Sequence, residues 1–410
     1  MTSDKNKDKD FSFEAVPQTA RKAFWAMFFI MLGFTFFSSS MSVGAKLGNG
    51  LDLKGYVVSV LTGSVFLSVY TGFLAFIGCK SGLSFDQLAV QTFGHKGSYL
   101  PSLMIAITQI GWFGVGVAMF SAPAAEVLGI SRVYLIAAAG FCMTLSAYFG
   151  IKGMEIISYI SVPLIAVLGV YSMVTAVNGS NGLASLFAQS AGSLSIYQGI
   201  SLTIGSFVAG GTTTPNFTRF ASTKKSAVIS TVIAFFLGNM LMLSFGAVGG
   251  ALTGKDDIFY VMMAQGLIVP ALVVLGANIW TTNDNTLYNA GLGLANITKI
   301  RKKPMVVVAG VVGTIASVWI YNNFVSWLSI LNATLPPIGA VLIFDYFIVR
   351  HQKDESNENI SAVRVGNVIS VAAGSLCGMF IPVGVASINA MTVSVILCLI
   401  LKMANKDRIK

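Results

Sequence analysis

The chain has 410 residues, of which 55% are hydrophobic and only 10% are charged. Soluble globular domains contain about 25% charged residues, so this composition excludes a soluble enzyme or binding domain and indicates a bilayer as solvent. The formal net charge of +10 does not indicate nucleic-acid binding, because the basic residues lie in short loops between apolar segments. These segments are continuous rather than alternating, which favours membrane helices over a barrel.

The apolar segments predict an all-α integral membrane protein with twelve transmembrane helices. We expect them near 23–47, 55–79, 100–127, 133–150, 154–176, 197–219, 226–251, 259–293, 304–320, 322–348, 364–381 and 384–403. Most Lys and Arg residues fall on one side, whereas the other side receives only Lys46, Lys54, Arg132 and Lys255. By the positive-inside rule, both tails (1–22 and 404–410) are expected in the cytoplasm. The clearest cytoplasmic loops are Lys299–Lys303 and Arg350–Glu358, and Leu183–Ser195 can form a short interfacial helix at most.

Two of the predicted spans contain runs of small and hydroxylated residues at mid-membrane. The first span contains Gly33–Gly44 and the sixth contains Gly205–Pro215. Glycine and β-branched residues lower helix propensity and Pro215 lacks a backbone donor, so each run is a candidate break in its helix. The alternative for each run is close packing of neighbouring helices through small residues, as in Gly246-x-x-x-Gly250.

The spacing of the two runs favours the broken helices. They lie about 172 residues apart, and each opens a set of five spans. Because five is odd, the second set (177–348) runs opposite to the first (23–176), with two further helices in 349–403. Interrupted helices at matching positions of inverted repeats are typical of the binding site of a secondary transporter.

The eighth span carries a dense polar run, Asn278–Asn285, that includes the carboxyl group of Asp284. Asn278, Thr281 and Thr282 share one helix face. Together with the backbone carbonyls of Phe37 and Ser40 at the first break, this face predicts a five-oxygen sodium site. The alternative is that both threonine hydroxyls bond to carbonyls four residues earlier.

A second set of residues favours a flat heteroaromatic solute. Gln109 and Trp112 share a face of the third span with Thr108, and Phe207 lies at the second break. Stacking of a base on an aromatic side chain contributes about 1–3 kcal/mol. Backbone groups expected to read the ring edge lie near Gly205, Ser206 and Ala209. The alternative for a single aromatic residue is lipid contact or core packing.

The sequence offers no enzymatic constellation. Gly254-Lys255 is followed by Asp256 and so does not complete a nucleotide-binding loop. The two histidines, His95 and His351, lie far apart in polar stretches, and the four cysteines lie in apolar segments. We therefore expect a transporter with no cofactor, rather than an enzyme.

Several longer motifs carry a family resemblance. They are Val16-Pro17-Gln18, Thr35–Ser38, Thr108–Phe120, Asn278–Asn285 and Tyr321–Val325. Over nearly its whole length, the chain resembles the purine–cytosine permeases of the nucleobase–cation symporter family. The resemblance implies the 5+5 inverted-repeat fold of the amino-acid transporter LeuT, with discontinuous helices 1 and 6. It also implies sodium-coupled import of cytosine by alternating access across a bacterial inner membrane, by a chain expected to be monomeric.

The resemblance also implies the site residues. The sodium ligands expected are Phe37, Ser40, Asn278, Thr281 and Thr282. The substrate site expected comprises Gln109, Trp112, Gly205, Ser206, Phe207, Ala209, Asn278 and Asn283. One departure is Ala209, where the family pattern has a serine, so a side-chain hydroxyl is lost there and only a backbone contact to the base can remain. The open alternatives are proton coupling, a purine, allantoin or hydantoin substrate, and a channel or membrane receptor.

Overall fold

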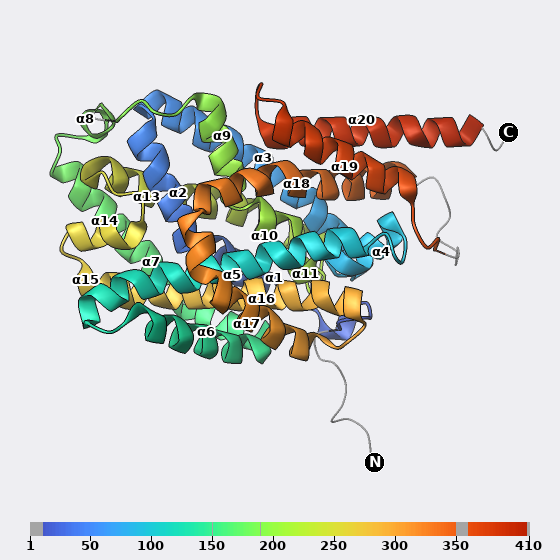
Figure 1. Cartoon of the computed structure of the whole chain (residues 1–410), viewed down its shortest axis with the longest axis horizontal. Coiled ribbons are helices and arrows are strands. Elements are labelled where there is room, and N and C mark those ends of the chain that lie inside the picture. Colours follow the sequence, from blue (N-terminus) through green and yellow to red (C-terminus); the bar gives the residue numbers. More distant parts are fainter. Residues whose placement is uncertain (1–10, 150, 189, 350–359, 408–410) are drawn as a thin grey trace, which may run out of the picture.

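The computed structural model describes residues 11–149, 151–188, 190–349 and 360–407, and in these ranges every regular element is a helix (Figure 1). Among them, seven helices are long and apolar enough to cross a membrane, and the bent pair α1 and α2 makes an eighth candidate. The expected all-helical membrane fold is therefore confirmed. The count of twelve spans stays a prediction, and the loop Arg350–Glu358 falls outside the described residues.

The first break lies where the run of small residues predicts it. Helix α1 (Phe24–Thr35) and helix α2 (Ser38–Gly50) are bent by 49° relative to each other. Phe36 and Phe37 connect them, and Phe37 has the extended backbone conformation φ −122°, ψ 125°. The chain at this point leaves the helical hydrogen-bond ladder, which frees backbone groups in the middle of the protein.

The second break divides its span into three pieces. Helix α9 (Ile196–Gly205) is followed by α10 (Val208–Thr212) and α11 (Pro215–Thr218). Pro215 occupies the first position of α11, where its missing N–H costs no intrahelical hydrogen bond. The predicted discontinuity is thus present, and it is longer than the first one.

The remaining long helices follow the predicted spans closely. They are α3 (Leu53–Ser81), α5 (Tyr99–Leu128), α6 (Arg132–Tyr148), α7 (Ile151–Asn178), α12 (Lys224–Ile233) continuing through η2 (Ala234–Gly238) into α13 (Asn239–Thr253), α17 (Lys302–Asn322), α18 (Phe324–Phe344) with η4 (Asp345–Val349), α19 (Val365–Phe380) and α20 (Ala386–Asp407). Shorter elements are η1 (Gln18–Ala20), α4 (Phe85–Phe93) and α8 (Leu183–Phe187), the last being all that forms of the expected interfacial helix.

The eighth predicted span differs from the expectation. Residues 259–293 do not form one helix, because α14 (Ile258–Ala264) ends in a turn at Gly266, whose φ of +79° suits glycine. A new helix begins with α15 (Ile268–Pro270) and runs through η3 (Ala271–Leu275) into α16 (Gly276–Thr298). Proline fits in the first turn of this helix, so the turn and Pro270 together set where it starts.

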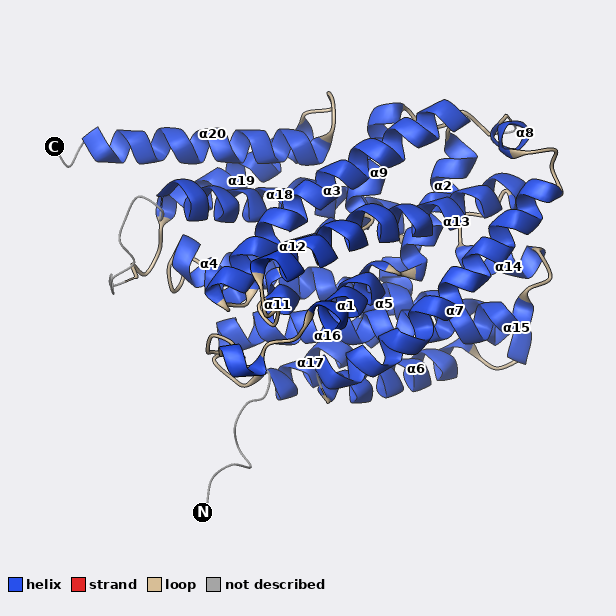
Figure 2. Cartoon of the chain, turned by 180° about the vertical axis from the view of Figure 1, so that it is seen from behind, coloured by secondary structure: helices blue, strands red, loops and turns tan. Residues whose placement is uncertain are grey.

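Close backbone packing joins α2 to α13. A side chain added at Gly246 of α13 would collide with the backbone of Met41 in α2, and one at Gly250 would meet Ala45. The small residues of Gly246-x-x-x-Gly250 therefore serve helix packing, as their spacing predicts. In both views of the fold, α19 and α20 lie beside α18 at one edge, whereas α6 and α17 lie at the opposite edge (Figures 1 and 2).

Candidate functional site

A small cavity lies where the two breaks meet α5 and α16. Its volume is about 20 Å³. A water molecule needs a volume of about 10–15 Å³ by this measure, so the closed cavity has room for one water and not for a heterocycle. The lining residues are Phe34, Phe37, Gln109, Trp112, Ser206, Phe207, Gly210, Thr282 and Thr286.

Two aromatic side chains form walls of this cavity. Trp112 packs edge-to-face on Phe37 at 5.7 Å and on Phe324 at 5.8 Å between ring centroids. Phe207 packs edge-to-face on Phe34 at 5.1 Å and on Phe235 at 5.4 Å. Because each ring packs against two other aromatic rings, its orientation is restricted.

Gln109 presents an unused donor at the same cavity. Its side chain is 1% exposed, and its Nε2 has no hydrogen-bond partner among the described residues. Leaving a buried donor unpaired costs about 1–3 kcal/mol, so an acceptor on a bound solute would recover this cost. The neighbouring Ser206 hydroxyl donates to the Thr203 carbonyl at 2.7 Å and lies 3.3 Å from Nδ2 of Asn239.

Asn278 ties the first break to α16. Its Oδ1 accepts hydrogen bonds from the backbone N–H and the hydroxyl of Ser38, each at 2.8 Å. Its Nδ2 donates to the carbonyl of Phe36. The amide thus satisfies groups that the break removes from the helical ladder, and it fixes where the break lies relative to α16.

The residues expected to hold sodium make local hydrogen bonds around this contact. Thr281 and Thr282 donate to the carbonyls of Ala277 and Asn278, at 2.9 and 3.2 Å, as the alternative interpretation of these threonines requires. A donating hydroxyl oxygen still has lone pairs for a cation. The carbonyl of Phe37 accepts from the Ser40 N–H at 2.9 Å, and the Ser40 hydroxyl is buried without a partner among the described residues. Sodium binding at these residues therefore stays a prediction.

Four of the expected substrate residues do not line the cavity: Asn278, whose contacts are given above, and Asn283, Gly205 and Ala209. Asn283 turns its Nδ2 toward the Phe113 carbonyl (3.3 Å) and the Met143 sulfur (3.1 Å), between α5 and α6. Gly205 packs against Asn332 of α18, and Ala209 is buried in the first turn of α10. In this closed arrangement these residues border the site rather than face its interior.

Sequence reasoning missed several neighbours of the site. Thr286 lies one turn after Thr282 on the same face of α16, so helical spacing could have identified it. Ser161 of α7, whose hydroxyl lies 3.2 Å from that of Thr281, gave no comparable signal. Asp284 faces away from the cavity lining and accepts a hydrogen bond from Ser146 at 2.5 Å, and Ser146 in turn accepts from Trp280.

A buried arginine at the C-terminal end of α11 contacts the N-terminal segment. Arg219 is fully buried and donates to the carbonyl of Phe11 at 2.9 Å and to the hydroxyl of Tyr288 at 3.0 Å. Burial raises the pKa of nearby Asp86 to about 6, although the hydroxyl of Ser102 and the charge of Arg219 lower it. Two further polar contacts involve residues just before α14. Lys46 lies 3.3 Å from Asp256, and the Tyr321 hydroxyl lies 2.5 Å from Asp257.

Comparison with known proteins identifies the relatives of this chain. The sequence pattern of a family described as "Permease for cytosine/purines, uracil, thiamine, allantoin" matches residues 15–399. The cytosine permease of Escherichia coli strain K12 is 47% identical over 388 residues, which cover 94% of this chain and 92% of that protein. The hydantoin permease of Microbacterium maritypicum is 22% identical over 329 residues, covering 72% and 67%.

Solved structures share the fold at low sequence identity. The nucleobase-cation-symport-1 family transporter Mhp1, closed around bromovinylhydantoin, superimposes with a TM-score of 0.80 at 17% identity, covering 94% of this chain and 93% of that one. A Na⁺-coupled sialic acid symporter gives a TM-score of 0.70 at 13% identity, covering 93% and 90%. At such identities the similarity concerns the fold alone.

Proposed function

The chain belongs to the family of permeases for cytosine, purines, uracil, thiamine and allantoin, and we propose that it imports cytosine together with sodium. As a member of this family it is a multi-pass membrane transporter of nucleobase-type solutes and not an enzyme. The more specific proposal is that the transported base is cytosine and that the coupled ion is sodium.

The observation that carries the proposal is the unpaired amide of Gln109 in a cavity walled by Trp112 and Phe207. A planar pyrimidine offers two faces for stacking and a carbonyl oxygen for the Gln109 donor. The closed cavity is too small for such a ring, so entry requires its walls to separate. This requirement fits a carrier whose site opens to one side at a time, and it argues against a channel, which needs a continuous open path.

Sodium coupling is supported by the contact between the first break and α16. Hydroxyl and carbonyl oxygens without formal charge suit a hard monovalent cation. Five residues are proposed to provide the ligands: Phe37, Ser40, Asn278, Thr281 and Thr282. Because Asn278 also holds the break through Ser38 and Phe36, an ion bound there would stabilise the arrangement that forms the base site. Such coupling is reciprocal: cytosine must raise the affinity for sodium by the same factor.

We further propose the architecture that this mechanism needs. Twelve spans would form a 5+5 inverted repeat, 23–176 and 177–348, followed by two helices in 349–403. Both termini would lie in the cytoplasm, and the chain would function as a monomer in the bacterial inner membrane. The paired breaks in α1–α2 and α9–α11 support this arrangement.

Uptake of radiolabelled cytosine into proteoliposomes tests the proposal. We expect accumulation with an inward sodium gradient, and little with an imposed proton gradient at equal sodium on both sides. Competition by uracil, adenine, allantoin and hydantoin then ranks the substrates. Accumulation driven by protons alone would contradict sodium coupling. A competitor that binds better than cytosine would contradict cytosine as the substrate.

A further inference from the structure

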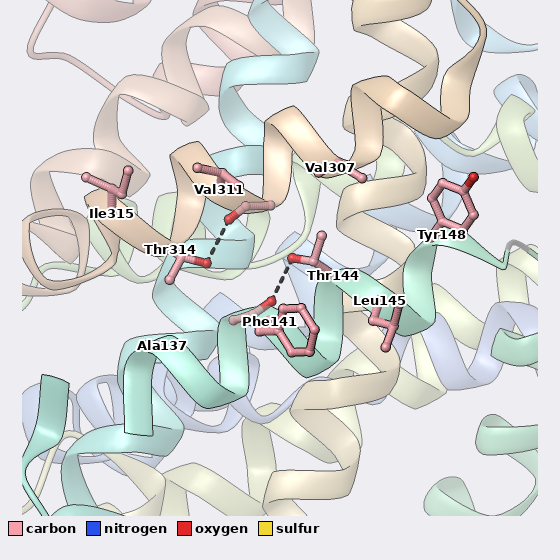
Figure 3. Close-up of a pocket in the computed structure, with 11 residues that line it drawn as sticks. Ala137, Phe141, Thr144, Leu145, Tyr148, Val307, Val311, Thr314 and Ile315 are labelled. Carbon is pink, nitrogen blue, oxygen red and sulfur yellow. Dashed lines mark hydrogen bonds between the residues drawn. The ribbon is translucent and has the colours of Figure 1, made fainter. Parts of the chain in front are cut away.

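An apolar groove, much larger than the central cavity, lies on the outside of the protein between α6 and α17 (Figure 3). Its volume is about 450 Å³. Its side chains are open to the surroundings: Phe141 is 67% exposed and Ile315 is 80% exposed. Since α17 is a candidate membrane span, this groove faces the lipid rather than the transport pathway.

A reciprocal contact forms the floor of the groove. A side chain at Gly140 would collide with Thr314, and a side chain at Gly310 would collide with Thr144. The two threonine hydroxyls donate to carbonyls of their own helices, Thr144 to Gly140 at 2.6 Å and Thr314 to Gly310 at 2.7 Å (Figure 3). The glycines therefore set the depth of the groove, and the two threonine hydroxyls already donate to the backbone. Such a surface suits a hydrocarbon chain.

One end of the groove is basic. Tyr148 lines the groove at the end of α6, and Nζ of Lys303 lies 5.0 Å from the centre of its ring. Arg301 and Lys303 are both exposed where α17 begins. Positive charge beside an apolar groove complements a molecule that has a negative head and an apolar tail.

We propose that this groove binds an anionic phospholipid, with one acyl chain between α6 and α17 and the headgroup at Lys303 and Arg301. Charge complementarity distinguishes this occupant from a zwitterionic lipid, which would fill the apolar part equally well. Because α6 packs on α16 as well as on α17, a lipid held there contacts a helix that in turn supports the proposed ion ligands.

Native mass spectrometry of the full-length chain in detergent tests the site with two probes, phosphatidylglycerol and phosphatidylcholine. The variant Val311→Trp fills the groove, whereas Val312→Trp changes an adjacent exposed residue of the same helix that does not line it. We expect Val311→Trp to weaken phosphatidylglycerol binding by at least about fivefold, and Val312→Trp to leave it unchanged. Equal effects of the two variants would overturn the groove as the site.

A second pair of variants tests the basic end of the groove. Lys303→Gln is expected to weaken phosphatidylglycerol binding about fivefold, the contribution of one basic residue at an anionic surface, and to leave phosphatidylcholine binding unchanged. Lys225→Gln, at another exposed lysine, is the control. Equal binding of both lipids to the unmodified chain would overturn the proposal. So would a dimer that excludes lipid from α6 and α17, because the occupant would then be a second copy of the chain. These readouts do not depend on transport.

Discussion

Both broken helices leave backbone groups outside the helical hydrogen-bond ladder, and they satisfy these groups in different ways. At the first break, Phe36 and Phe37 leave the helix, and the side-chain amide of Asn278 pairs with the carbonyl of Phe36 and with the N–H and hydroxyl of Ser38. The second break has two interruptions, and hydroxyls within it mainly bond to nearby carbonyls, such as Thr212 to Val208 at 2.8 Å and Thr213 to Gly210 at 2.9 Å. The first break is thus held by one side chain of α16, whereas the second combines these local bonds with contacts from several helices, such as Asn289 of α16 to Thr213 at 3.1 Å and Tyr70 of α3 with Thr212 at 2.8 Å.

The two breaks also differ in the residues that the proposal assigns to them. The proposed ion ligands lie at the first break and on α16, whereas Phe207, which is proposed to stack on the solute, belongs to the second break and lines the cavity. Substitutions at each break should therefore affect ion and solute separately, except where one residue belongs to both.

Asn278 belongs to both the proposed ion site and the proposed base site, and its loss should have the largest effect. In Asn278→Ala, the buried Ser38 N–H loses its acceptor, which costs about 1–3 kcal/mol, and uptake at limiting sodium and cytosine should fall roughly a hundredfold. Sodium titrations of uptake provide the measurement. Asn285→Ala is the control, because Oδ1 of this buried asparagine on the same helix has no partner among the described residues. Similar losses in both variants would argue against a special role for Asn278.

Trp112→Ala should separate the solute from the ion. The loss of one stacking face should weaken cytosine binding about thirtyfold and leave the sodium concentration for half-maximal binding in the absence of cytosine unchanged. Equilibrium binding of labelled cytosine and of sodium measures the two effects. Trp319→Ala, at a residue that is 68% exposed, is the control. Cytosine affinity close to that of the unmodified chain would rule out the stacking role.

The double variant Thr281→Ala with Thr282→Ala should have the opposite selectivity. Removing two hydroxyl ligands should raise the sodium concentration needed for half-maximal uptake about tenfold, with a smaller effect on cytosine at saturating sodium. Thr298→Ala removes a hydroxyl that makes the same kind of bond to a carbonyl of the same helix, and should have no effect. An unchanged sodium activation curve would refute the ion site.

The smallest effect is expected at Ala209. Ala209→Ser restores the hydroxyl that the family pattern has near the second break, and one additional hydrogen bond should strengthen cytosine binding about threefold. The same competition panel measures this change, with Ala209→Gly as a variant that adds no hydroxyl. If serine leaves the ranking of the bases unchanged, then this position does not select the base.

Local patterns predicted the parts of the site that lie within one helix. The face formed by Asn278, Thr281 and Thr282 follows from helical spacing, and the breaks follow from runs of small residues. The orientation of Asn283 did not follow, because it depends on Gly116 of α5, where any larger residue would collide with its amide. The contacts of Arg219 did not follow from the sequence either, since two of its partners, the carbonyl of Phe11 and the hydroxyl of Tyr288, are far away in the sequence. Such contacts are set by tertiary packing, which spacing along the chain does not encode.

The small volume of the central cavity has a consequence for the helices around it. With room for about one water molecule, the cavity can take up a ring only when its aromatic walls move apart. Trp112 packs on Phe324 of α18, and Phe207 packs on Phe235 of η2. A movement of either wall would therefore displace a side chain of a further element, so that entry of a solute would change the packing beyond the two broken helices.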